Sequence, residues 1–130
     1  MFLSIDPGNG LAIYDQVVRQ IIFAIAGGAA KPGELIPSVR ELARDLALNP
    51  NTIARAYREL QSHGVLTAVR GTGLKVASGS DAVCRSRRTE LIRARLRQVL
   101  SEAQLSRLDG DELRTLVDEE LAGLLAQKQG

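Results

Sequence analysis

Apolar residues recur every three or four positions near the start of the chain, which is the period of a helix with one buried face. The pattern predicts a helix over residues 11–26, and Gly27 and Gly28 predict its end. The residues of its apolar face are Tyr14, Val17, Val18, Ile21, Ile22 and Ile25.

Two shorter helices are predicted to follow and to meet at a tight turn. The second helix begins at Ser38, because Ser38 and Glu41 have the spacing of a capping box. It ends before Asn49, since Pro50 disfavours helical geometry in the residue before it. With Asn49 as the N-cap and Pro50 as the first helical residue, a third helix opens at once and ends at Gly64. Its apolar stripe consists of Ile53, Ala56, Tyr57 and Leu60.

The next segment has the pattern of a β-hairpin. Two strand-like runs, residues 65–69 and 74–77, flank a glycine-bearing turn at residues 70–73. The order helix, helix, tight turn, helix and hairpin is that of a winged helix-turn-helix. The polar residues 78–81 predict a joint between a winged helix-turn-helix domain of residues 1–78 and a helical region of residues 79–130.

The region beyond this joint predicts two more amphipathic helices. One begins between Asp81 and Ser86, and the other follows Asp109-Gly110, where Asp109 is the cap. Two such helices cannot bury both apolar stripes on each other and on a small domain, so the tail is predicted to cover them with a second copy of the chain. The predicted fold class is mainly α with a small β-hairpin, a winged helix-turn-helix followed by a two-helix dimerisation tail.

Composition limits the possible classes of protein. The chain has 130 residues, 45% hydrophobic and 25% charged, which suits one globular domain with a short appendage. Its single cysteine, Cys84, cannot form an internal disulfide, and its N-terminus lacks the pattern of a signal peptide. No apolar run approaches the roughly 20 residues that span a bilayer. These features predict a cytoplasmic protein without a membrane segment.

The net charge of +2 is too small to indicate a nucleic-acid partner by itself. The charges are unevenly placed, however, with arginines in the first part of the tail and acids in the last. An arginine group of this kind is more often a solvated or intersubunit face than a nucleic-acid surface. The arginines concerned are Arg85, Arg87, Arg88, Arg93, Arg95 and Arg97.

The third helix has a polar leading edge, and the N-terminal end of a recognition helix enters the major groove of DNA. Asn51, Thr52 and Arg55 project from this end. Arg55 is predicted to contact bases, because a guanidinium can bond both acceptors of a guanine. Arg40, in the first turn of the second helix, is predicted to lie near the same groove.

The turn of the hairpin supplies three further candidates for DNA contact, Arg70, Gly71 and Thr72. Glycines here would let the backbone approach the sugar-phosphate edge or the minor groove. Each feature also has a purely structural explanation: a cap at Thr52, a solvated helix face at Arg55, and a simple turn at the glycines. The prediction of DNA binding therefore rests on the helix, turn and hairpin features taken together and not on any one of them.

This combination resembles the GntR family of bacterial transcription regulators. The matching stretches are residues 13–16, residues 32–43, residues 49–57, Leu60, Gly64 and residues 71–73. The resemblance implies an operator-binding dimer. The residues that it places near DNA are Ser38, Arg40, Asn51, Thr52, Arg55, Arg70 and Gly71. Ala12 departs from a common proline and Lys75 from a common wing aromatic, which leaves open where the first helix starts and how the wing packs.

The tail indicates the subfamily. About fifty residues follow Ala77, too few for the large ligand-binding domains of most GntR branches or for the aminotransferase-like domain of the MocR branch. A two-helix tail resembles the YtrA branch, which implies dimerisation through the tail and regulation of operons that often encode ABC transporters. The leading prediction is a homodimeric repressor on double-stranded DNA, since a protein bound to an operator blocks polymerase.

Two other function classes remain open at this point. A winged-helix module that binds another protein would bind without the steep salt dependence of DNA binding. A small enzyme is disfavoured by the single histidine, the single cysteine and the lack of a metal-ligand cluster. No cofactor or metal is predicted, and the sequence identifies no effector ligand.

Overall fold

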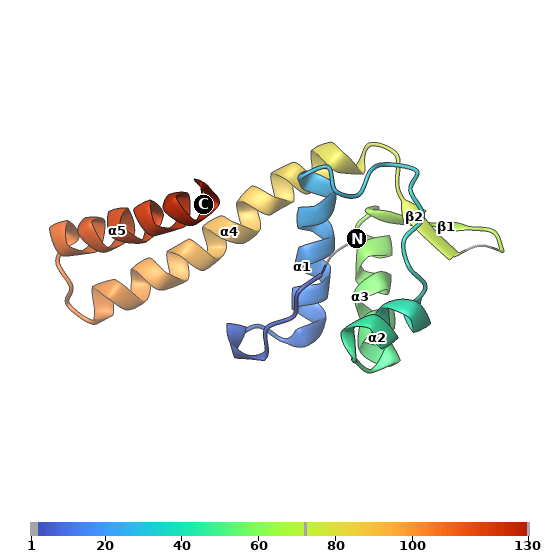
Figure 1. The fold of residues 1–130 in the computed structure, drawn as a ribbon, viewed down its shortest axis with the longest axis horizontal. Helices are drawn as coiled ribbons and strands as arrows, with labels where there is room; N and C mark the ends of the chain where they lie inside the picture. The colour runs from blue at the N-terminus through green and yellow to red at the C-terminus, as the bar shows by residue number, and fades with distance from the viewer. Residues whose placement is uncertain (1–2, 72, 130) are drawn as a thin grey trace. The chain divides into compact units, whose positions relative to one another are not determined.

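The computed structural model describes residues 3–71 and 73–129. In chain order its elements are η1 (Pro7–Asn9), α1 (Ile13–Ala26), α2 (Val39–Leu46), α3 (Pro50–Ser62), β1 (Leu66–Val69), β2 (Gly73–Val76), α4 (Ser80–Leu105) and α5 (Gly110–Gln129) (Figure 1). The chain divides into two compact units, one up to Leu91 and the other from Ile92 on. The predicted fold class, mainly α with a small β-hairpin, is confirmed.

The core of the first unit lies where α3 packs against both α1 and α2 (Figure 1). The predicted apolar faces are buried, α1 through Val17 and Ile21 and α3 through Ile53 and Leu60. Burial of side chains of this size contributes roughly 1.5–3 kcal/mol each. This packing fixes the rotation of α3 about its axis, so that its polar edge lies at the surface.

The first helix begins at Ile13 rather than at residue 11. The buried Gln16 side chain explains the difference, because its amide donates to the backbone carbonyls of Asp6 at 2.8 Å and Leu11 at 3.1 Å. Its carbonyl accepts from the Asp6 amide at 2.9 Å. These bonds hold the N-terminal segment beside the first turn of α1, where the chain cannot continue the helix.

The caps of α2 and α3 form as predicted. Ser38 Oγ accepts from the Glu41 amide at 3.1 Å, and Glu41 Oε1 accepts from the Ser38 amide at 3.5 Å. α2 ends at Leu46, and its C-cap, Ala47, adopts a left-handed conformation with φ of 54°. The Asn49 side chain accepts from the Asn51 amide at 2.8 Å and caps α3. Local sequence signals thus set both ends of the tight turn.

The wing contains more pairing than the hairpin that the sequence predicted. β1 and β2 pair antiparallel, with Leu66 opposite Val76. On the other edge of β2, the backbone forms an isolated bridge between Leu35 and Lys75. Hydrogen bonds from Gly33 N to Val76 O at 2.8 Å and from Val76 N to Glu34 O at 2.9 Å extend this pairing. The segment before α2 therefore holds the base of the wing.

The start of α4 belongs to the core of the first unit. Ser80 begins the helix earlier than predicted, and its Oγ donates to the Ala77 carbonyl at 2.7 Å. Cys84 is fully buried, and this burial raises the pKa of its thiol, so Cys84 serves as a small apolar core residue. The first turns of α4 therefore belong to the first compact unit, which extends to Leu91.

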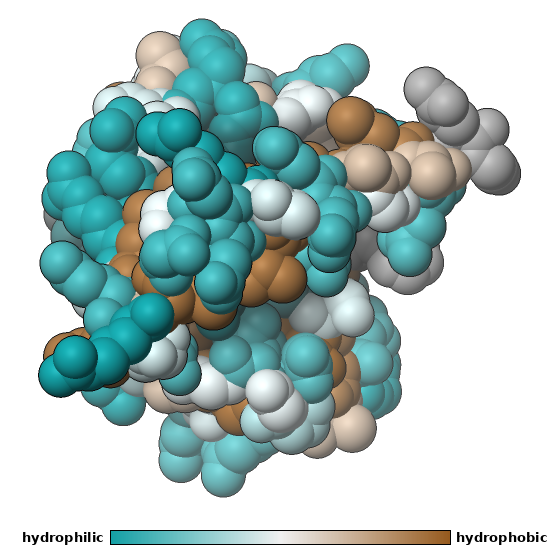
Figure 2. Space-filling model, turned by 90° about the vertical axis from the view of Figure 1, so that its left-hand side faces the viewer, coloured by the Kyte–Doolittle hydropathy of each residue, from teal (hydrophilic) through white to brown (hydrophobic). Residues whose placement is uncertain are grey.

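The second unit consists of the later part of α4 together with α5. Asp109 Oδ1 accepts from the Glu112 amide at 2.9 Å, so Asp109 caps α5 as predicted. None of the described side chains from residue 92 to residue 128 is buried. Figure 2 looks from the side on which the α4–α5 connection lies in Figure 1 and shows brown hydrophobic surface open between teal side chains. A single chain therefore leaves the apolar stripes of both helices in water.

Candidate nucleic-acid interface

The polar leading edge of α3 faces solvent. Asn51 and Arg55 are exposed and Thr52 is partly exposed, while Ile53 and Ala56 on the opposite face of α3 are fully buried. The apolar stripe thus turns the candidate contact residues outward. The positive dipole end of α3 lies at the same edge, where it favours negative charge such as phosphate.

The beginning of α2 lies beside α3 through a bond that the sequence did not indicate. The Tyr57 hydroxyl of α3 donates to the Pro37 carbonyl at 2.7 Å, immediately before the α2 cap. This bond ties the start of α2, which carries Ser38 and Arg40, to the recognition helix. Both Ser38 and Arg40 are exposed, so the structure leaves both candidates accessible.

Replacing Tyr57 by phenylalanine is expected to lower the free energy of unfolding by about 1 kcal/mol at neutral pH, because the Pro37 carbonyl loses its donor. Burial of the hydroxyl raises the pKa of Tyr57 above its ordinary value of 10.0, and the negative charge of the Glu41 carboxylate raises it further by a smaller amount. The folded state therefore keeps a proton that the unfolded state releases, and the Tyr57 contribution to stability is lost as pH rises above about 10.

Denaturant unfolding of both proteins at neutral pH and above pH 10 measures this contribution. The stability advantage of the wild type over Tyr57→Phe is expected to shrink at the higher pH. An advantage that stays constant across this range would contradict the role given to the Tyr57 hydroxyl.

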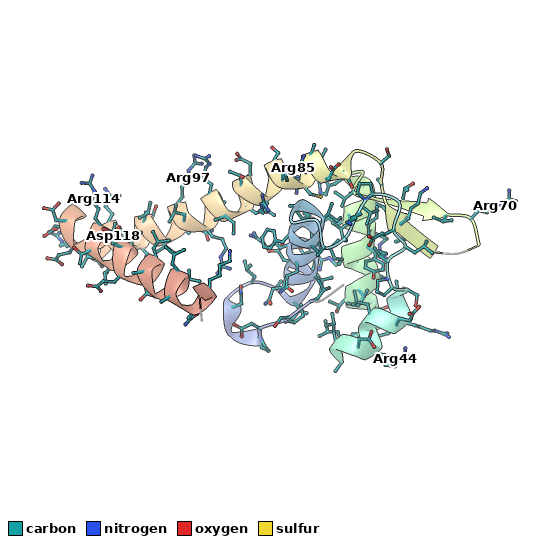
Figure 3. All side chains as sticks on the ribbon, turned by 45° about the horizontal axis from the view of Figure 1, so that its top comes forward. Arg44, Arg70, Arg85, Arg97, Arg114 and Asp118 are labelled. Atoms are coloured by element: carbon teal, nitrogen blue, oxygen red, sulfur yellow. The ribbon has the colours of Figure 1, made fainter. Side chains whose placement is uncertain are left out.

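The tip of the wing carries the next candidates. Arg70 lies at the tip of the hairpin (Figure 3), and both Arg70 and Gly71 are exposed. Gly71 has φ of 77° and Gly73 has φ of 117°, in the region that favours glycine, so a side chain at either position would strain the turn. Thr72, the third predicted wing residue, lies outside the described residues.

The structure also brings α1 to the edge of the recognition helix. A shallow cleft of about 360 Å³ is lined by Ile13 and Tyr14 of α1 and by Asn51, Thr52 and Arg55 of α3. The Arg55 guanidinium carbon lies 3.7 Å from the centroid of the Tyr14 ring. Periodicity could place Tyr14 only on the face of α1 that turns toward the core, and it carried no signal for this contact.

The arginine group of the tail lies along α4, which runs from the first compact unit into the second. On α4, Arg85 Nη1 lies 3.6 Å from Asp81 Oδ2 one helical turn away, an exposed pair that contributes little to stability. Figure 3 shows Arg97 on α4 and Arg114 and Asp118 on α5. Within residues 3–71 and 73–129, no group of three or more histidine, cysteine or acidic side chains could hold a metal ion. None of the described helices has both the length and the apolar character of a bilayer-spanning segment.

Comparisons with known proteins agree with this geometry. The family model described as "Bacterial regulatory proteins, gntR family" matches residues 13–76. The HTH-type transcriptional repressor YtrA of Bacillus subtilis (strain 168) is 31% identical over 117 residues, which cover 90% of this chain and 90% of YtrA.

Solved structures show the same similarity. A GntR family transcriptional regulator from Listeria monocytogenes matches with a TM-score of 0.68 and 31% identity, over 85% of this chain and 96% of that one. The DNA-binding domain of AraR in complex with operator ORX1 matches with a TM-score of 0.51 and 30% identity, over 59% of this chain and 99% of that one.

The relatives are transcription regulators and not enzymes, which confirms the prediction that this chain has no catalytic function. The matched residues run from the start of α1 to the end of β2 and include the recognition helix and the wing. The chain belongs to the GntR family of bacterial regulatory proteins, in its YtrA-like branch, and is a DNA-binding transcription regulator.

Proposed function

We propose that the protein is a homodimeric repressor that acts in the cytoplasm and binds a pseudopalindromic operator. The observation that carries this proposal is the exposed polar edge of α3, which the packing of α3 against α1 and α2 holds at the surface. Arg55 contacts base edges there, with Asn51 and Thr52 beside it. The operator complex of the AraR domain, a relative of similar fold, supports the same use of the fold in this chain.

The remaining candidates act on the DNA backbone. Ser38 and Arg40 at the start of α2 lie at a helix end that is tied to α3, and a hydroxyl or guanidinium there can donate to phosphate. At the wing, Arg70, Gly71 and Thr72 contact the sugar-phosphate edge or the minor groove. These contacts set the register of the protein on the duplex, while Arg55 provides the choice of sequence.

The second unit supports a dimer. Val99 exposes 57% and Leu124 64% of its surface, and no described residue in this unit is buried. Covering each such side chain contributes roughly 1.5–3 kcal/mol, and a twofold copy covers both stripes at once. We assign DNA binding to residues 1–78 and dimerisation to residues 79–130, with the first turns of α4 also serving the core of the first unit through Cys84.

The dimer determines the form of the operator. Two recognition helices related by a twofold axis contact two half-sites about one helical repeat apart, or a multiple of it. The similarity to YtrA, a transcriptional repressor, supports repression in this protein. We extend the proposal to an operon that encodes a transporter, on the resemblance of the tail to that branch.

Selection of bound fragments from the genomic DNA of the source organism, followed by sequencing, tests the proposal. The recovered fragments are expected to share an inverted repeat. The logarithm of the binding constant for this repeat is expected to fall linearly with the logarithm of the salt concentration. Recovery of fragments without a shared repeat, or binding that does not respond to salt, would contradict operator recognition.

A further inference from the structure

The Arg55 guanidinium is stacked on an aromatic ring from another helix. Its central carbon lies 3.7 Å from the centroid of the Tyr14 ring, well within the roughly 6 Å over which a cation is attracted to a ring face. Tyr14 lies in the first turn of α1, and Arg55 lies in the second turn of α3. The contact therefore joins two helices that are distant in the sequence.

The backbone on both sides of this contact is held firmly. Val17, one turn after Tyr14, and Ala56, next to Arg55, are both fully buried where α1 packs on α3. Tyr14 is partly buried, whereas Arg55 is exposed. The ring thus forms a fixed platform at the surface, and the flexible arginine side chain lies on it.

Stacking uses the flat face of the guanidinium and leaves its edge available. The N–H donors that bond a guanine lie along that edge. Within the described part of the chain, no carboxylate or carbonyl oxygen competes for them. A long arginine side chain has many rotamers in water, and a platform that limits them reduces the entropy lost when DNA binds.

We propose that Tyr14 is a positioning residue for DNA recognition, whose ring holds the Arg55 guanidinium with its donor edge toward a base in the major groove. The shallow cleft lined by Ile13, Asn51 and Thr52 lies at the same place and gives the base room to approach. This inference rests on the proposed role of Arg55 in contacting bases. It adds Tyr14 of α1, which makes no base contact itself, to the residues that determine which DNA sequence the protein prefers.

Four variants of the full-length protein test this role: Tyr14→Leu, Tyr14→Phe, Arg55→Ala and the double variant Tyr14→Leu/Arg55→Ala. The measured quantity is the ratio of affinities for the selected operator and for an unrelated duplex at one salt concentration. Tyr14→Leu is expected to lower this ratio by about two- to fivefold for each half-site, the range of an exposed cation–π contact. Tyr14→Phe keeps the ring and is expected to retain the ratio.

The double variant separates positioning from a general structural role. If Tyr14 acts through Arg55, then Tyr14→Leu changes the ratio no further once Arg55 is alanine. An equal loss with and without Arg55, or a loss in Tyr14→Phe that matches Tyr14→Leu, would overturn the inference. A ratio that Arg55→Ala leaves unchanged would reject the base contact itself, and the positioning role with it.

Pentafluorophenylalanine at position 14 provides a second test should Tyr14→Leu fail to fold. This side chain keeps the size and shape of the ring but reverses the charge distribution on its face. A loss of operator preference with unchanged thermal unfolding is expected. Unchanged preference in this variant would show that attraction between ring and cation does not position Arg55.

Discussion

Replacing Leu124 by glutamate is expected to convert the proposed dimer into single chains of 14.0 kDa and to weaken operator binding by about 10²- to 10⁴-fold. Leu124 lies in the C-terminal half of α5, on the same helix face as Leu113 and Val117. An unpaired carboxylate in a covered stripe costs several kcal/mol, so the second copy is lost. Each half-site is then bound separately, without the gain that comes from linking two contacts.

A matched control is available two residues away. Ala122 is exposed and lies on the opposite side of α5, so Ala122→Glu adds the same charge outside the stripe. Sedimentation equilibrium gives the mass of each protein, and fluorescence anisotropy with a labelled operator gives the affinity. A wild-type protein that sediments as a single chain at working concentration, or a Leu124→Glu variant that remains dimeric, would contradict dimerisation through this stripe.

The second large effect is expected at Arg55. Replacement by alanine should reduce the preference for operator over unrelated DNA by about 1–3 kcal/mol for each half-site, which is the worth of a bidentate contact to one base. Binding to unrelated DNA should change much less, because it depends on the number of neutralised phosphates. Competition titrations with both duplexes at several salt concentrations separate these two quantities.

Arg58 provides the comparison on the same helix. It is exposed and lies farther from the leading edge of α3, so Arg58→Ala removes an equal charge at some distance from the bases. This variant is expected to leave the preference intact, whatever its effect on total affinity. Equal loss of preference in both variants would assign the effect to charge and not to a base contact by Arg55.

Local sequence signals predicted the parts of the site that depend on neighbouring residues. The capping box of Ser38 and Glu41 and the cap of Asn49 appear in the structure with the expected bonds, because both partners lie within three residues of each other. The apolar period of α3 predicted correctly that Asn51 and Arg55 would face solvent. These features require only the geometry of a helix.

Contacts between distant segments were not visible in the same way. The bond from Tyr57 to the Pro37 carbonyl, the bridge between Leu35 and Lys75, and the stack of Arg55 on Tyr14 each join residues that are far apart in the chain. Tyr14 and Tyr57 both appeared as members of apolar stripes. A stripe indicates that a residue turns inward, but it does not identify the atom that its hydroxyl or ring will meet.

The sequence by itself determined the order of the helices, the tight turn between α2 and α3, the hairpin and the exposed polar edge of α3. The tertiary structure alone decided that Cys84 and the start of α4 complete the core of the first unit, and that α1 supports the recognition helix through Tyr14. The physical reason is the range of the forces involved. Caps and helical periods act over a few residues of one segment, whereas packing depends on how separate segments approach each other in space.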